Sequence, residues 1–198
     1  MHYTIFDTPI VRHLFAWISR GLLALFGWRL EGQFPNLPKY VMIAAPHTSN
    51  WDFPVTLGIC FAAHAKVYWM GKHTLFWGPF GPVMRWLGGI PVDRTQKNSL
   101  VEQLVQVYAR SERLVVIIPP EGTRAAVNQW KTGFYHIAMG AKVPIILGFL
   151  DFKRKVGGFG PVFHPTGQIE ADFASMRAFY ADKTGKNPPP VEATKNKY

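Results

Sequence analysis

A histidine and an aspartate separated by four residues are the first candidates for chemistry in this chain. They are His47 and Asp52 in the stretch HTSNWD, directly after an apolar run, 40–45, that is typical of a buried strand. Five helical steps of about 100° would leave positions 47 and 52 about 140° apart on a helix. The two side chains can therefore meet only if His47 lies on a loop and Asp52 lies near the start of the following helix. The carboxylate would then accept the imidazole Nδ1–H and leave Nε2 free as a base. The alternative is a loop histidine with a local hydrogen bond.

A second polar block, PEGTR at 120–124, follows another apolar run. Gly122 permits a tight turn with exposed backbone N–H groups, Thr123 adds a hydroxyl donor, and Arg124 can make a forked contact with phosphate oxygens. Glu121 could orient an arginine or a substrate hydroxyl. The block indicates an anion-binding turn, and the alternative is a strand-end turn with a surface ion pair, which is worth little.

Other common catalytic arrangements are missing from the sequence. It contains no Gly-x-Ser-x-Gly nucleophile elbow, no His-Glu-x-x-His and no cysteine pair, since Cys60 is the only cysteine. We therefore expect His47 to activate a hydroxyl of the substrate rather than one of the enzyme, and we expect no metal. Together the two blocks predict an enzyme that activates a hydroxyl on a phosphorylated or otherwise anionic substrate.

The elements that would position these blocks alternate between strands and helices. This alternation favours the α/β class, with a mixed, mostly parallel sheet flanked by helices. Apolar runs predict strands at 39–45, 66–70, 90–93, 113–118, 144–150 and 161–169. Helical periodicity predicts helices at 50–63, 83–87, 98–111, 130–141 and 172–181. The stretch GGFG at 157–160 is typical of a turn into the last strand.

The N-terminal segment, residues 1–30, predicts an amphipathic helical segment that lies in a membrane interface. Apolar residues recur at helical spacing, and Trp17 and Trp28 widen the apolar face. Arg20 and Gly21 interrupt the run, which makes it a poor membrane-spanning helix and a poor signal peptide. The alternative is a first helix that packs on its own domain.

Composition and charge indicate the domain organisation and the partners of the chain. Residues 31–182 are expected to form one catalytic domain, and the polar, proline-containing end, 183–198, predicts a disordered tail. The formal net charge of +10 would attract anionic phospholipid, acidic carrier proteins or nucleic acid. Lysine and arginine are spread over both halves of the chain, which argues against a nucleic-acid partner.

Four blocks in this order resemble the glycerolipid acyltransferase family, the lysophosphatidic acid and glycerol-3-phosphate acyltransferases. They are HTSNWD at 47–52, GGIPVDR at 88–94, PEGTR at 120–124 and VPI at 143–145. KHTLF at 72–76 resembles the lysine-containing stretch that precedes the second block in this family. The similarity covers about residues 39–150.

The resemblance implies a mechanism and a set of site residues. His47 would take the proton from an acceptor hydroxyl as it attacks an acyl thioester, and Asp52 would hold the imidazole and balance its charge. The remaining blocks would hold the phosphate or head group of the acceptor through Lys72, Arg94, Glu121, Gly122, Thr123 and Arg124. No cofactor is implied, and acyl-CoA or acyl carrier protein would be the co-substrate.

The resemblance also implies partners and a location. The acceptor would be 1-acylglycerol-3-phosphate or a similar lysophospholipid, and the enzyme would lie on the cytoplasmic face of a membrane as a peripheral or monotopic protein. Two alternatives stay open: an esterase-type hydrolase that uses His47 to activate water, and a non-catalytic basic module that binds anionic lipid. Lys131 could shape the acceptor pocket, whereas His136 is expected to be structural.

Overall fold

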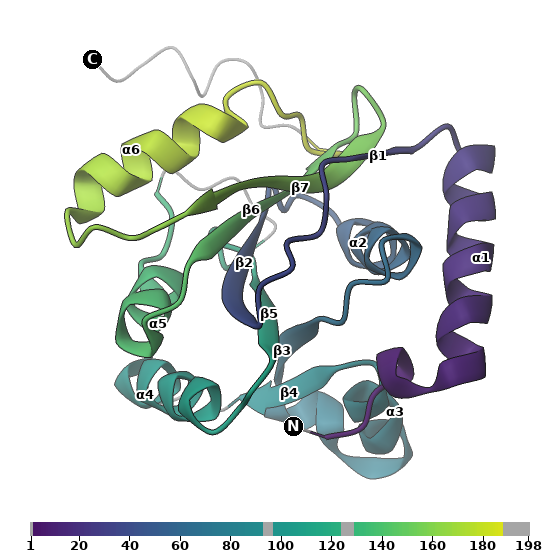
Figure 1. Cartoon of the computed structure of the whole chain (residues 1–198), viewed down its shortest axis with the longest axis horizontal. Coiled ribbons are helices and arrows are strands. Elements are labelled where there is room, and N and C mark those ends of the chain that lie inside the picture. Colours follow the sequence, from purple (N-terminus) through teal and green to yellow (C-terminus); the bar gives the residue numbers. More distant parts are fainter. Residues whose placement is uncertain (1, 93–96, 124–128, 188–198) are drawn as a thin grey trace.

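Seven strands form one sheet in the order β1-β7-β6-β2-β5-β3-β4 (Figure 1). The structure is a computed structural model that describes residues 2–92, 97–123 and 129–187. The strands are β1 (Arg29–Glu31), β2 (Lys39–Ala45), β3 (Tyr68–Lys72), β4 (Gly89–Val92), β5 (Leu114–Ile118), β6 (Ile145–Asp151) and β7 (Val156–Phe163). Neighbouring strands pair in parallel except for β6 and β7, which are antiparallel. The predicted α/β class with a mixed, mostly parallel sheet is confirmed.

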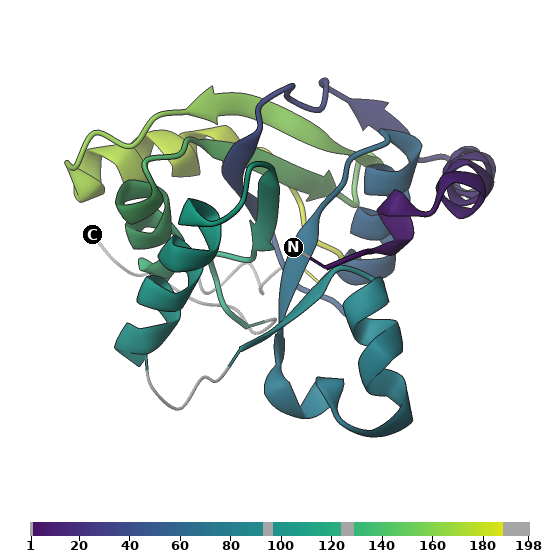
Figure 2. The ribbon, with the colours of Figure 1, turned by 60° about the horizontal axis from the view of Figure 1, so that its bottom comes forward.

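Helices cover both faces of this sheet (Figure 2). They are α1 (Pro9–Leu25), α2 (Asp52–Ala62), α3 (Gly81–Trp86), α4 (Lys97–Ala109), α5 (Gly133–Ala141) and α6 (Ile169–Tyr180), with 3-10 turns η1 (Ile5–Asp7), η2 (His73–Phe76) and η3 (Gly78–Phe80). Side chains alternate along β2, so that Val41 and Ile43 join the core under α4, α5 and α6. Tyr40 and Met42 join the second core, under α2 and η1.

Helix α1 packs outside α2 and leaves one side uncovered. Arg20 donates from Nε and Nη2 to the Ala62 carbonyl oxygen, at 3.1 and 2.8 Å, and so ties α1 to the end of α2. Ile10, Trp17 and Leu25 are 82%, 79% and 77% exposed. Among the described residues, no helix is both long and apolar enough to cross a membrane. The inner side of α1 packs on its own domain, and membrane contact of the outer side stays a prediction.

The N-terminal segment is not separate from the sheet. Ile5 and Phe6 of η1 are buried in the core under α2. Strand β1 pairs with β7 in parallel, with Arg29 opposite Val156. The expected boundary between residues 30 and 31 therefore runs through a strand.

The GGFG stretch at 157–160 forms part of β7, and the prediction of a turn there was wrong. The turn lies earlier, where Asp151 Oδ1 accepts the backbone N–H groups of Lys153 and Arg154, each at 3.1 Å. A Cβ atom on Gly158 would overlap with the Glu31 carbonyl oxygen of β1. Gly158 therefore allows the backbone of β1 to approach closely, which is the other common use of glycine in a strand.

The first part of the predicted disordered tail is ordered in the structure. Residues 183–187 are described and fold back onto the domain, and Phe152 N donates to the Thr184 carbonyl oxygen at 2.8 Å. Polar composition predicted disorder here, but backbone and amide hydrogen bonds stabilise this stretch without an apolar side chain. Residues 188–198 lie outside the described residues.

Candidate active site

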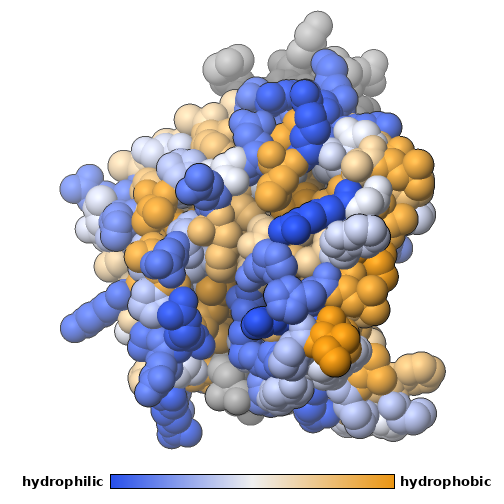
Figure 3. All heavy atoms as spheres, turned by 45° about the vertical axis from the view of Figure 1, so that its right-hand side comes forward, coloured by the Kyte–Doolittle hydropathy of each residue, from blue (hydrophilic) through white to orange (hydrophobic). Residues whose placement is uncertain are grey.

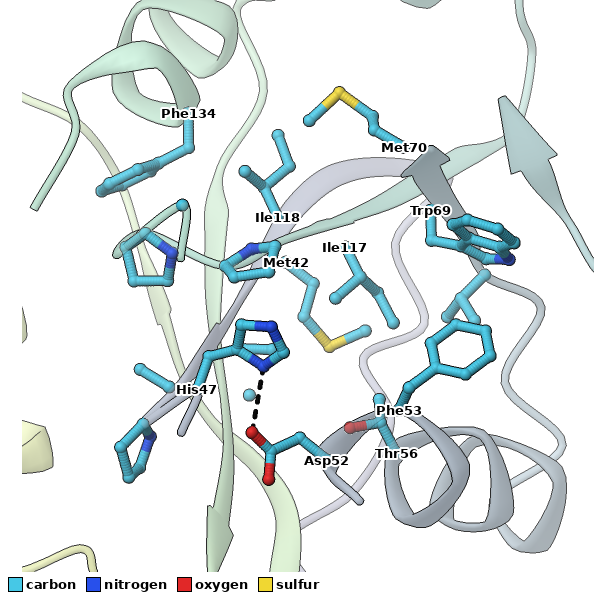
Figure 4. A pocket seen from close by; sticks show the side chains of 18 of the residues that line it. Met42, His47, Asp52, Phe53, Thr56, Trp69, Met70, Ile117, Ile118 and Phe134 are labelled. Carbon is cyan, nitrogen blue, oxygen red and sulfur yellow. Dashed lines mark ion pairs between the residues drawn. The ribbon is translucent and has the colours of Figure 1, made fainter. Parts of the chain in front are cut away.

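The side chains of His47 and Asp52 meet at the end of β2. His47 lies on the loop after β2, and Asp52 is the first residue of α2. His47 Nδ1 is 3.0 Å from Asp52 Oδ2, and the opposite edge of the ring, which carries Nε2, faces a cavity (Figure 4). The His47 side chain is 23% exposed and that of Asp52 is 5% exposed. This geometry is the loop-and-helix-start arrangement that the spacing of the two residues requires.

Asp52 is held by the loop that it follows. Its Oδ2 atom accepts the backbone N–H groups of Thr48 at 2.7 Å and Ser49 at 2.9 Å, in addition to facing His47. Asp52 Oδ1 is buried and makes no hydrogen bond to the described part of the chain. Charge-assisted hydrogen bonds from two amides compensate for burial of the carboxylate. They also fix the oxygen that receives the imidazole, so the orientation of His47 depends on the path of residues 47–52.

Glu121 approaches the same loop from the end of β5. Its Oε1 atom accepts the backbone N–H of His47 at 3.3 Å. Burial raises the pKa of the Glu121 carboxyl above its ordinary value, and hydrogen bonds from its own backbone and from that of His47 oppose the shift. Glu121 therefore joins the two polar blocks through the backbone of His47.

A cavity of about 1250 Å³ opens beside His47. One arm lies between α2 and the sheet and is apolar, lined by Met42, Ile59, Cys60, Ile117 and Phe159. Phe53, Trp69 and Ile118 also line the cavity (Figure 4). The volume exceeds the ~300–1,000 Å³ usual for a small-molecule pocket. Such a space can take a long apolar group and a second molecule together.

The polar side of the cavity includes the turn after β5. Gly122, with φ of +67°, and Thr123 line it together with Lys131. A Cβ atom on Gly122 would lie 2.8–2.9 Å from the Lys131 side chain, so the lysine lies directly over the turn. The sequence indicated Lys131 only as a residue that could shape the acceptor pocket, because its sequence context also fits an ordinary helix start.

Of the three remaining predicted site residues, the structure describes Lys72. Lys72 is exposed at the end of β3 and does not line the cavity. The predictions for Arg94 and Arg124 fall outside the described residues. His136, expected to be structural, lines the cavity and is exposed. No cluster of potential metal ligands occurs within residues 2–92, 97–123 and 129–187.

Residues 31–146 match the family model described as "Acyltransferase". This chain belongs to the acyltransferase family. Its relatives include the 1-acyl-sn-glycerol-3-phosphate acyltransferase of Haemophilus influenzae, 31% identical over 66% of this chain and 56% of the relative. The enzyme of the same name from Escherichia coli is 29% identical over 73% of this chain and 62% of the relative. The match therefore spans less than two thirds of the length of either relative.

One solved structure has the same fold. It is the 1-acyl-sn-glycerophosphate acyltransferase of Thermotoga maritima, with a TM-score of 0.61, 16% sequence identity, and coverage of 88% of this chain and 82% of that chain. The likeness at this sequence identity shows a shared fold.

Proposed function

We propose that this acyltransferase moves a fatty acyl group from a thioester to the hydroxyl of a lysophospholipid, with 1-acylglycerol-3-phosphate as its acceptor. The observation that carries the proposal is the His47–Asp52 pair at the edge of a large apolar cavity. The names of the bacterial relatives agree with this acceptor. The donor would be acyl-CoA or acyl carrier protein.

In the proposed mechanism, Asp52 accepts the Nδ1–H of His47, so that Nε2 has a free lone pair. Nε2 removes the proton from the acceptor hydroxyl while its oxygen attacks the thioester carbonyl carbon. The carbon–sulfur bond then breaks, and the protonated imidazole returns the proton to the thiolate. The products are an ester and a free thiol, and His47 is regenerated without a metal or a covalent enzyme intermediate.

The cavity supports a division between the two substrates. The arm between α2 and the sheet suits a fatty acyl chain, because apolar side chains line it. Thr123 and Lys131 lie on the polar side, where an ammonium group and a hydroxyl suit the phosphate of the acceptor. His47 would stand between the acyl carbonyl and the attacking hydroxyl.

The surface supports docking on a membrane. Figure 3 shows hydrophobic residues gathered on the right-hand side of that view, where α1 lies. Trp77, between η2 and η3, and Phe80 of η3 are 68% and 71% exposed. Trp86 Nε1 donates to Thr8 Oγ1 at 3.4 Å, which ties α3 to the start of α1. Phe53 is 41% exposed and also lines the cavity. A lipid acceptor would thus enter the site from the bilayer side.

A panel of acceptors tests the proposed reaction. The labelled acyl group would be supplied as acyl-CoA and, separately, as acyl carrier protein thioester. The acceptors are 1-acylglycerol-3-phosphate, glycerol 3-phosphate and lysophosphatidylcholine. We expect the highest kcat/KM with 1-acylglycerol-3-phosphate, since it supplies both an acyl chain and a phosphate dianion. Ester formation no faster than the blank with every acceptor and both donors would refute the proposal.

Substitutions on the exposed side of α1 test the docking surface. Replacing Trp17 and Leu25 together by glutamate should lower binding to anionic phospholipid vesicles by roughly tenfold or more, since each buried apolar side chain contributes ~1.5–3 kcal/mol. Cosedimentation measures the bound fraction. Val162→Glu, an exposed valine on β7, is the matched control and should bind as the wild type does. Equal binding of all three proteins would mean that α1 packs on its own domain and does not bind the membrane.

A further inference from the structure

The chain after α6 turns back toward the candidate active site. Figure 1 shows this segment in yellow, leaving α6 toward the hairpin of β6 and β7. We call residues 183–187 the strap. Phe152 N donates to the Thr184 carbonyl oxygen at 2.8 Å, which fixes the strap to that hairpin. Lys183 Nζ lies 5.1 Å from the centroid of the Phe149 ring and so ties the start of the strap to β6.

The far end of the strap contacts the loop that carries His47. Asn187 makes two hydrogen bonds to Thr48: its backbone N–H donates to Oγ1 at 3.2 Å, and its Nδ2 donates to the carbonyl oxygen at 3.1 Å. Gly185 is buried against the same residue, where an added Cβ would lie 2.5 Å from Thr48 Oγ1. Lys186 Nζ lies 4.6 Å from the centroid of the Trp51 ring. The strap therefore holds both ends of the stretch between His47 and Asp52.

Thr48 connects the strap to the catalytic pair. Its side chain and carbonyl oxygen accept hydrogen bonds from Asn187, and its backbone N–H donates to Asp52 Oδ2. The same Oδ2 atom faces His47 Nδ1. A shift of Thr48 would move a donor away from the oxygen that orients the imidazole. A misplacement of about 1 Å at a reacting group costs on the order of 10²-fold in rate. The contact between Asn187 and Thr48 would therefore affect the rate of the reaction.

We propose that the strap is a positioning element of the active site, in which Asn187 and Thr48 keep the loop at 47–52 in the geometry that orients His47. This inference rests on the proposed function, in which His47 is the base. It extends the site beyond residues 31–146, which the family model matches, to a segment whose composition predicted disorder. The strap acts through Thr48 and need not touch either substrate.

Two substitutions of Thr48 in the full-length protein test the proposal. Thr48→Val has the same shape but lacks the oxygen that accepts the N–H of Asn187. Thr48→Ser keeps that oxygen. We expect Thr48→Val to lower kcat by about tenfold or more with little change in acceptor KM, in line with the cost of misplacing a catalytic group. Thr48→Ser should restore most of the rate.

Two further measurements separate positioning from general stability and from the proposed function. In a His47→Ala background, Thr48→Val should cause no further loss, because its effect passes through the imidazole. The ¹⁵N chemical shifts of His47 should report an Nδ1–H tautomer in the wild type and a mixture in Thr48→Val. These shifts report the tautomer even if the protein acylates no acceptor. An inactive wild type would then refute only the proposed acyl transfer. Unchanged kcat and tautomer in Thr48→Val would overturn the role of the strap.

Discussion

Replacement of His47 by alanine should lower kcat for acyl transfer by ~10²–10⁴-fold, the usual contribution of a general base. The imidazole is the group that lies between the Asp52 carboxylate and the cavity. Without it, the acceptor hydroxyl would have to lose its proton to water. Acceptor KM should change little, because the phosphate is expected to contact the turn after β5. Steady-state kinetics with 1-acylglycerol-3-phosphate measures both constants.

The matched control for this substitution is His164→Ala. His164 is exposed on the loop after β7 and does not line the cavity. It should keep the wild-type rate. The midpoint of thermal unfolding, Tm, should be close to that of the wild type for both variants, since neither side chain is buried. A His47→Ala protein that retains turnover while remaining folded would exclude the imidazole as the base.

Replacement of Asp52 by alanine should lower kcat by on the order of 10²-fold or more, because the orientation and charge balance of the imidazole are lost together. It should also destabilise the protein. The backbone N–H groups of Thr48 and Ser49 would lose their acceptor, and each unpaired buried group costs about 1–3 kcal/mol. Chemical denaturation measures this second effect separately from kinetics.

Asp52→Asn separates orientation from charge. A single oxygen, Oδ2, accepts both amides and faces His47, whereas Oδ1 makes no hydrogen bond to a described residue. An asparagine can place its carbonyl oxygen at the Oδ2 position and keep these contacts, so it should be more active and more stable than alanine. The double variant His47→Ala with Asp52→Ala should be no slower than His47→Ala alone, because the two residues act as a unit. Additive losses would mean that Asp52 acts independently of His47.

The contact between His47 and Asp52 could be predicted because it depends on local geometry. A spacing of five residues cannot bring two side chains together on a regular helix. An apolar strand before His47 and helical periodicity after Asp52 therefore predicted that, if the two side chains meet, His47 lies on a loop and Asp52 lies at a helix start. The α/β class followed in the same way from alternating patterns whose periods differ between strands and helices. Both inferences depend on residues that are close together in the sequence.

The features that could not be predicted depend on contacts between distant residues. Strand β1 has three residues and is exposed along its length, so it has no apolar pattern. Gly158 of β7 leaves room for the backbone of β1, and no local sequence signal reports this close approach. The strap is held by hydrogen bonds to Phe152 and Thr48, and its own sequence is polar. Lys131 lines the cavity and lies over the turn at Gly122, a contact that the sequence alone does not report.

The most direct test of the central claim is the ratio of free thiol released to ester formed, with and without 1-acylglycerol-3-phosphate. In the proposed mechanism, His47 activates the acceptor hydroxyl and not water. We predict one thiol released for each ester formed when the acceptor is present, and thiol release no faster than the blank when it is absent. Release of thiol and free fatty acid without acceptor, at the rate measured with acceptor, would contradict the account, because it would make the protein a thioester hydrolase.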